Sequence, residues 1–269
     1  MAAPVVTFLS DYGLTDDFVG VCHGVIATIC PDARVIDISH GVDRHDVRAG
    51  ALLLAGALPY MPVGVHLAVV DPDVGAERRA VALRLADDRL LVGPDNGLLW
   101  PAAHAGGGAV EAVDIGTSSF RLEPVSATFH GRDIFAPVAA RLAAGAPFAE
   151  AGKPTDPDGL VKLELPRPRR DGPTLVAHAL YVDRFGNVQL DISHDDLADS
   201  GLKLGHRARL AVPSGTFEAQ YARTFADVQA GHLLLYEDAY RRLAVAVSHG
   251  DAAERVGLAL DDELRITPL

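Results

Sequence analysis

Cysteine and positive charge are both scarce in this sequence, and each shortage excludes a class of protein. Only Cys22 and Cys30 occur among the 269 residues. They fall within one expected helix, where their spacing separates them by about 12 Å, too far for a disulfide. The chain is therefore not expected to be a disulfide-stabilised scaffold.

Basic residues number 24 against 36 acidic ones, and the formal net charge is −12. Nucleic-acid binding depends on neutralising phosphates with Lys and Arg, so no nucleic-acid partner is expected. The first residues lack the charged start and long apolar core of a secretory signal, which indicates a cytoplasmic protein. The apolar run 51–70 has the length of a membrane span. Prolines at 59 and 62 and Gly64 interrupt it, so we interpret it as buried core and expect no membrane association.

Apolar residues make up 49% of the sequence, enough for a sizeable core. In the first half of the chain, short β-branched runs alternate with amphipathic stretches. That alternation is typical of an α/β domain with a mostly parallel sheet. The helix over 16–30 should place Phe18, Cys22 and Ile26 on its buried face. Strands are expected at 4–9, 34–38 and 65–70 and as a pair within 79–93, and further helices at 44–58 and 131–143.

Residues 146–173 are rich in proline and charge, which favours a connector rather than an element. From Thr174 onward the runs are short and strand-like, with turns between them, which predicts a small antiparallel barrel or sandwich. We therefore expect an N-terminal α/β domain at 1–165 and a smaller C-terminal antiparallel β-barrel domain at 174–269.

Polar residues follow the expected strands at their carboxyl ends: Asp11, His40, Asp71 and Asp95. In an open parallel sheet these ends lie along one edge, where ligands bind, so the residues should converge on one crevice. The alternative for each is an ordinary turn. The segment PDNG at 94–97 keeps that interpretation because Asn-Gly is a strong turn signal.

His130 precedes an expected helix, whose amide dipoles disfavour its protonation and help to keep the imidazole neutral. Arg78 cannot act as a base, but it can stabilise an anion. The alternatives are a surface or capping histidine and a solvated arginine that pairs with Glu77, which would contribute little to stability.

A metal site is the rival use of Asp11, His40, Asp71 and His130. The sequence has no HxH, HExxH or CxxC spacing, and an arginine close to the acid disfavours a cation, so we expect no metal.

Five segments together resemble the S-adenosyl-L-methionine (SAM) hydroxide adenosyltransferases, the hydrolase branch of the family that includes the SAM-dependent fluorinases and chlorinases. They are SDYGLTDDFVG (10–20), VVDPDVGAERR (69–79), PDNGLL (94–99), FHGRD (129–133) and VDRFGNVQLDI (182–192). The resemblance implies an α/β domain, a C-terminal β-barrel, and a homotrimer with active sites between one subunit's large domain and its neighbour's small one.

The resemblance also implies a reaction in which SAM, as substrate rather than cofactor, and water give adenosine and L-methionine. Asp71, Arg78 and His130 then surround the attacking water, and either Asp71 or His130 accepts its proton. The halogenases carry aromatic and hydroxyl residues in place of Asp71 and His130, which favours hydrolysis over halide transfer.

For the substrate, the resemblance implies that Asp11 binds the ribose and Asp16 lies near the methionine end. Asp183 would meet the methionine amino group and Asn187 would contact adenine, with main-chain groups of 248–253 beside the base. A halide transferase is one alternative, and two departures from the family pattern permit another, a SAM- or nucleoside-binding protein with little turnover. Asp73 and Ala76 replace a glycine and a threonine of the family loop, and Ala239 and Arg241 replace its Ser-x-Gly turn.

Overall fold

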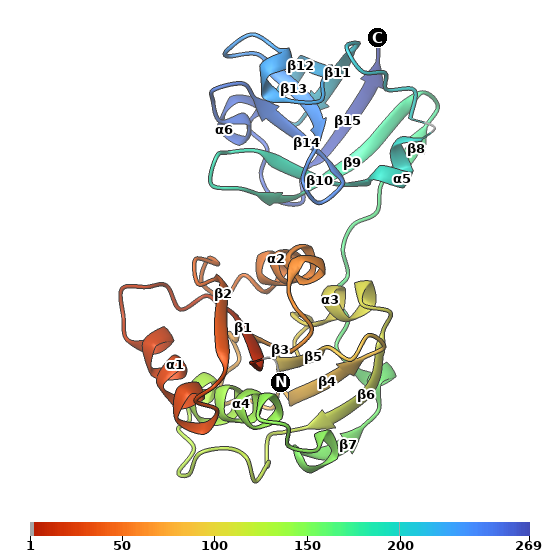
Figure 1. Ribbon diagram of the computed structural model, residues 1–269. Helices are drawn as coiled ribbons and strands as arrows, with labels where there is room; N and C mark the ends of the chain where they lie inside the picture. Colours follow the sequence, from red (N-terminus) through yellow and green to blue (C-terminus); the bar gives the residue numbers. More distant parts are fainter. Residues whose placement is uncertain (1–2, 199) are drawn as a thin grey trace. The chain divides into compact units, whose positions relative to one another are not determined.

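A computed structural model describes residues 3–198 and 200–269, and the chain divides into two compact units, Met1–Leu163 and Glu164–Leu269. The unit 1 sheet, as far as the described residues form it, has seven strands in the order β2-β1-β3-β5-β4-β6-β7 (Figure 1). Its strands are β1 (Val5–Ser10), β2 (Arg34–Ser39), β3 (Val65–Val69), β4 (Ala80–Leu85), β5 (Leu90–Pro94), β6 (Ala109–Asp114) and β7 (Lys153–Thr155).

The centre of this sheet is parallel, as predicted, because β2, β1, β3 and β5 all run in one direction. β4 runs antiparallel to both β5 and β6, and β7 antiparallel to β6. A tight turn joins β4 to β5, with Leu85 N–H donating to the Arg89 carbonyl at 2.9 Å. So short a connection can join antiparallel strands only, and the sheet is therefore mixed.

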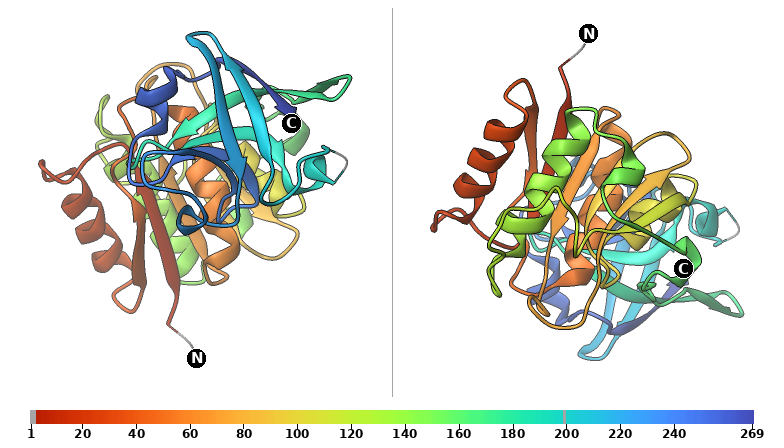
Figure 2. Two further views of the ribbon diagram at one scale, coloured as in Figure 1. Left: turned by 90° about the horizontal axis from the view of Figure 1, so that it is seen from above. Right: turned by 90° about the horizontal axis from the view of Figure 1, so that it is seen from below.

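Helices cover both faces of the sheet: α1 (Phe18–Ile29) packs against α4 (Ala136–Ala143), and α2 (Val47–Ala57) against α3 (Trp100–Ala105) (Figures 1 and 2). Neighbouring β1 residues face opposite layers, as the strand period of two requires. Phe8 belongs to the core cluster with Cys22 of α1, whereas Leu9 lies close to Gly50 of α2.

Both cysteines are free and buried. Burial raises the pKa of the Cys22 thiol to about 12.

The predicted helix over 131–143 is present, but its first part is a π-helical turn, η2 (Gly131–Phe135), which continues into α4. Pro137 has no N–H to donate to the Asp133 carbonyl four residues earlier. That carbonyl instead accepts the N–H of Leu122 at 2.8 Å. The helix therefore continues through Pro137, and the carbonyl that the proline leaves free connects the start of the helix to the preceding loop.

The apolar run 51–70 divides into α2, the short 3₁₀ turn η1 (Leu58–Tyr60) and β3. None of the helices in the described part of the chain combines the length and apolarity that crossing a bilayer requires.

Unit 2 is a closed barrel. Within its described residues seven strands follow the order β10-β14-β13-β12-β11-β15-β9, and β9 pairs with β10 to close the ring. The ring strands are β9 (Thr174–Val182), β10 (Val188–Ser193), β11 (Arg207–Val212), β12 (Gly215–Tyr221), β13 (Leu233–Glu237), β14 (Arg242–Val247) and β15 (Glu263–Pro268). Strand β8 (Arg169–Asp171) pairs with β9 outside the ring, and the helices of this unit are α5 (His194–Leu197) and α6 (Ala252–Val256). The predicted barrel is confirmed, although β12 and β13 pair in parallel where an antiparallel arrangement was expected.

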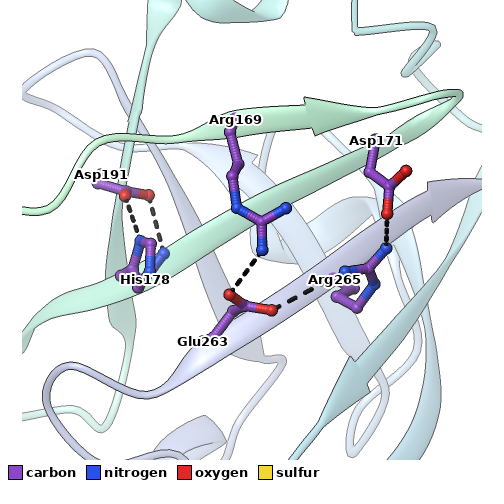
Figure 3. Close-up of polar contacts among 6 residues, drawn as sticks. All are labelled: Arg169, Asp171, His178, Asp191, Glu263 and Arg265. Atoms are coloured by element: carbon purple, nitrogen blue, oxygen red, sulfur yellow. Dashed lines mark hydrogen bonds and ion pairs between the residues drawn. The ribbon is translucent and has the colours of Figure 1, made fainter.

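The connector prediction for 146–173 was wrong at two places. β7 adds an edge strand to the first sheet, and β8 pairs with β9 in the second. Two surface ion pairs join β8 to β15, Arg169 with Glu263 at 3.0 Å and Asp171 with Arg265 (Figure 3). Both strands have three residues, too few for an alternating pattern to be recognised in the sequence.

Candidate active site

The loop 71–79 between β3 and β4 folds back on itself, which brings its two ends together. The N–H of Val74 donates to the Asp71 carbonyl at 3.3 Å, and Gly75 adopts a φ of +81°. Asp71 and Arg78 consequently meet in a two-point contact. Arg78 Nε donates to Asp71 Oδ1 at 2.8 Å, and Nη2 contacts Oδ2. The side chains are 8% and 6% exposed, so the loop carries a buried ion pair.

His130 joins this pair from the residue that precedes η2. Arg78 Nη2 lies 2.8 Å from His130 Nδ1. A guanidinium has donors only, so Nδ1 must accept and the proton of the neutral ring must lie on Nε2. Burial, followed by the charge of Arg78, lowers the pKa of His130. A lowered pKa favours the neutral imidazole expected from the sequence, but its causes are burial and Arg78, whereas the sequence had indicated the helix dipole.

A glycine allows the two loops to approach. A Cβ on Gly75 would lie 2.4 Å from the Ala127 carbonyl oxygen, far inside contact distance. The 126–133 loop is fixed in turn by the buried Asp133, whose Oδ2 accepts the N–H of Ser126 at 2.8 Å. This packing holds loop 71–79 beside the segment that carries His130.

Asp71 and His130 line a cavity of about 240 Å³, and Asp11 and Asp16 line the same cavity. Asp11 is oriented by the backbone, because the N–H of His45 donates to its Oδ2 at 2.9 Å. His45 has a φ of +66°. The cavity therefore contains three of the carboxylates expected there, while Arg78 contacts two of the lining side chains without lining it.

Further lining residues were not predicted from the sequence: Tyr12, Phe18, Arg44, His45, Val74, Thr128 and Gly131. Tyr12 and Phe18 form an aromatic group with Phe129, with ring centroids 5.2–5.9 Å apart. Phe18 was expected in the helix core, but it is 40% exposed at the start of α1. Helical periodicity could not separate a core residue from a cavity residue at the first turn.

Two of the expected polar residues do not line this cavity. His40 is buried, with Nδ1 2.7 Å from Ser10 Oγ. Asp95 accepts from Arg79 Nε and the Val161 N–H, both at 2.8 Å, so PDNG is structural, as interpreted. Arg79 pairs with Asp95 and not with Glu77.

Asp183 and Asn187 belong to unit 2, in the turn between β9 and β10. Asn187 Nδ2 donates to Asp183 Oδ2 at 2.8 Å. The segment 248–253 lies beside this turn, because the N–H groups of Ala252 and Ala253 both donate to the Gly186 carbonyl at 3.0 Å. The structure thus brings together the three unit 2 elements that the resemblance singled out.

Arg241 and Asp73, which replace glycines of the family pattern, differ in backbone conformation. Arg241 adopts a φ of +60°, so it keeps a left-handed conformation at the expected glycine position. Asp73 is not left-handed, and its replacement of glycine requires no strained backbone.

Comparisons with known proteins cover nearly the whole chain. Residues 6–152 match the SAM hydroxide adenosyltransferase N-terminal domain, and residues 177–265 match the C-terminal domain of that family. A protein of Salinispora tropica named (R)-S-adenosyl-L-methionine hydrolase is 51% identical over 266 residues, which cover 98% of each chain. A Thermus thermophilus protein of the same name is 36% identical over 94% of this chain and 95% of its own length. A fluorinase of an Actinoplanes species is 29% identical over 90% of each chain.

Solved structures give the same result. The crystal structure of an uncharacterized conserved protein from Thermotoga maritima superimposes with a TM-score of 0.92 and 35% identity, covering 97% of this chain and 99% of the other. A conserved hypothetical protein from Thermus thermophilus gives a TM-score of 0.78 at 35% identity, covering 98% and 99%.

Proposed function

Since the chain belongs to the SAM hydroxide adenosyltransferase family, we propose that it hydrolyses (R)-S-adenosyl-L-methionine to adenosine and L-methionine. The main structural support for this proposal is the contact of Asp71, Arg78 and His130 at the wall of the cavity. Relatives at 51% and 48% identity over nearly the whole chain are named as hydrolases of this substrate.

The reaction breaks one bond and forms another. Water oxygen attacks the 5′ carbon of the ribose, the carbon–sulfur bond breaks, and its electron pair goes to sulfur. The sulfonium leaves as the neutral thioether of methionine, so the leaving group requires no proton. The site must position the water behind the 5′ carbon and accept one proton from it.

The hydrogen-bond geometry favours Asp71 as the proton acceptor. A carboxylate has about four lone-pair positions, and Arg78 occupies two of them on Asp71. His130 has already used its one lone pair on Arg78, so its Nε2–H is left to donate to the water and orient it. Arg78 holds the other two side chains in place and stabilises hydroxide character as it develops.

The same proposal includes the substrate contacts and the assembly. Asp11 binds the ribose, and Asp16 lies near the methionine end. Asp183 and Asn187 of a neighbouring subunit contact the methionine amino group and adenine, in a homotrimer with active sites between subunits. Free cysteines fit a reducing compartment, so the location that we propose is the cytoplasm.

Chromatography of purified protein incubated with (R)-SAM tests the reaction. We expect adenosine and methionine in equal amounts. Asp71→Asn, Arg78→Ala and His130→Ala should each lower the rate on the order of 10²-fold or more, whereas Arg207→Met, at a 72% exposed surface arginine, should not. SAM bound without products would establish a binding protein. Appearance of 5′-chloro-5′-deoxyadenosine with chloride would establish a halide transferase.

Mixing variants tests the shared site. Asp71→Asn and Asp183→Ala proteins are each expected to be nearly inactive. After joint unfolding and refolding, mixed trimers contain some sites that combine an intact Asp71 with an intact Asp183 and should regain activity. Absence of any recovery, with trimers present in sedimentation, would contradict a site shared between subunits.

A further inference from the structure

Three potential metal ligands converge in unit 1 outside the cavity described above. His23 comes from α1, Asp37 from β2, and His40 from the residue that follows β2. The Nε2 atoms of His23 and His40 lie 2.9 Å and 3.1 Å from the same Asp37 oxygen, Oδ1. One ligand atom of each residue lies within 4.8 Å of the other two. This His23–Asp37–His40 cluster therefore offers two imidazole nitrogens and one carboxylate oxygen.

The state of His40 separates this cluster from an ordinary surface ion pair. Its side chain is 2% exposed, and its Nε2, 3.1 Å from Asp37 Oδ1, is buried without a hydrogen-bond partner among the described residues. A buried nitrogen without a partner costs free energy, so it requires an explanation.

The other ring nitrogen of His40 is held in the manner expected of a metal ligand. Nδ1 lies 2.7 Å from Ser10 Oγ. When Nδ1–H donates to that oxygen, the lone pair of Nε2 points into the cluster. Ligating histidines usually donate their second N–H to a neighbouring oxygen in this way, which fixes the tautomer and the ring orientation.

The separations suit a first-row divalent metal. First-row divalent metals bind histidine nitrogen and carboxylate oxygen at about 2.0–2.2 Å, so two ligand atoms lie about 3.0 Å apart at the right angles of an octahedral ion and about 3.4 Å apart at the tetrahedral angle that zinc prefers. The observed nitrogen–oxygen distances of 2.9 and 3.1 Å match the octahedral value. Two histidines with one carboxylate are a ligand set used for zinc and for non-haem iron.

We propose that His23, Asp37 and His40 bind one divalent transition-metal ion, with octahedral coordination as the best fit, at a site separate from the hydrolytic one. None of these three residues lines the cavity. The ion would fasten α1 to the end of β2. Through Ser10 it would also support the chain next to Asp11. Its role is structural, so it adds no step to hydrolysis.

The test uses the full chain without a histidine tag, treated with a chelator and then titrated. Calorimetry with Zn²⁺ and the visible absorption of Co²⁺ should both report one ion per chain. His23→Ala and Asp37→Asn should weaken binding at least tenfold, since changes to groups that merely orient ligands already cost 10- to 100-fold. His104→Ala, at an exposed histidine of α3, should bind like the wild type.

Zinc should also raise the melting temperature of the wild type and of His104→Ala, but not that of His23→Ala. The two cluster positions chosen for substitution are partly exposed, at 35% for His23 and 42% for Asp37, so the variants should fold. Circular dichroism checks this. The proposal would be overturned by wild-type protein that binds neither ion at millimolar concentration, or by folded His23→Ala that binds both with unchanged affinity.

Discussion

Replacing Arg78 with methionine should remove both hydrolysis and a large part of the stability of unit 1. The Arg78 and Asp71 side chains are 8% and 6% exposed. Methionine keeps much of the side-chain volume but leaves the Asp71 carboxylate buried without its cation. Breaking a buried pair on one side typically costs about 3–5 kcal/mol, a sizeable share of the roughly 5–15 kcal/mol that stabilises a domain.

A second substitution separates the two effects. Adding Asp71→Asn to Arg78→Met removes the unpaired charge, so the double variant should recover most of the lost unfolding free energy while remaining inactive. Urea unfolding followed by circular dichroism gives the stability, and adenosine release gives the activity. The surface variant Arg207→Met, whose ion pair with Glu218 is exposed, should change stability by less than about 1 kcal/mol. Full stability in Arg78→Met, or wild-type turnover in the double variant, would refute the reasoning.

Three further predictions concern single positions. Burial lowers the pKa of His66 to about 4 from 6.5. The unfolded chain therefore binds the proton more readily, and about 3 kcal/mol of stability present above pH 6.5 should be lost as pH falls to 4. Thermal melts at several pH values measure this loss. The same pH dependence of the melting temperature in His66→Leu would contradict it. Gly75→Ala should slow adenosine release at least tenfold through its clash with Ala127, whereas Gly145→Ala, with a similar φ of +91° and open space around it, should not. Because the pKa of His130 is lowered, kcat/KM should stay level from pH 8 through 6.5, and a decline centred at or above 6.5 would count against a neutral imidazole.

The meeting of Asp11 and Asp71 at one cavity was predictable from local signals and one topological rule. Each follows a strand, and β1 and β3 are parallel neighbours, with Ser10 opposite Val69. Parallel pairing then puts the residues after both strands at the same edge. The rule fails for His40, which also follows a strand, because its ring turns into the interior beside Ser10.

The approach of Arg78 to His130 could not be derived from spacing. The two residues are 52 positions apart, and their contact depends on a folded-back loop pressed against the Ala127 carbonyl. The resemblance grouped these residues, but it did not reveal that the imidazole accepts from the guanidinium. That detail decides which side chain is free to take a proton.

The direction of strand pairs joined by long connections could not be predicted from the sequence either. β12 and β13 run parallel because the chain crosses between them instead of forming a hairpin. The stretch from 222 to 232 gives no local sign of that direction. Strand propensity identifies the members of a barrel, but the direction of each neighbour is set by closing the whole ring.

The two free thiols provide a built-in reporter for one half of the molecule. Cys22 and Cys30 are 0% and 5% exposed and both belong to unit 1, while the sequence contains no other cysteine. A thiol-specific reagent should therefore label the folded protein very slowly, and the labelling rate should follow the opening of the α/β domain alone. Unfolding of the barrel alone should leave the labelling rate unchanged, which allows the α/β domain to be monitored separately from the barrel in a single unmodified chain.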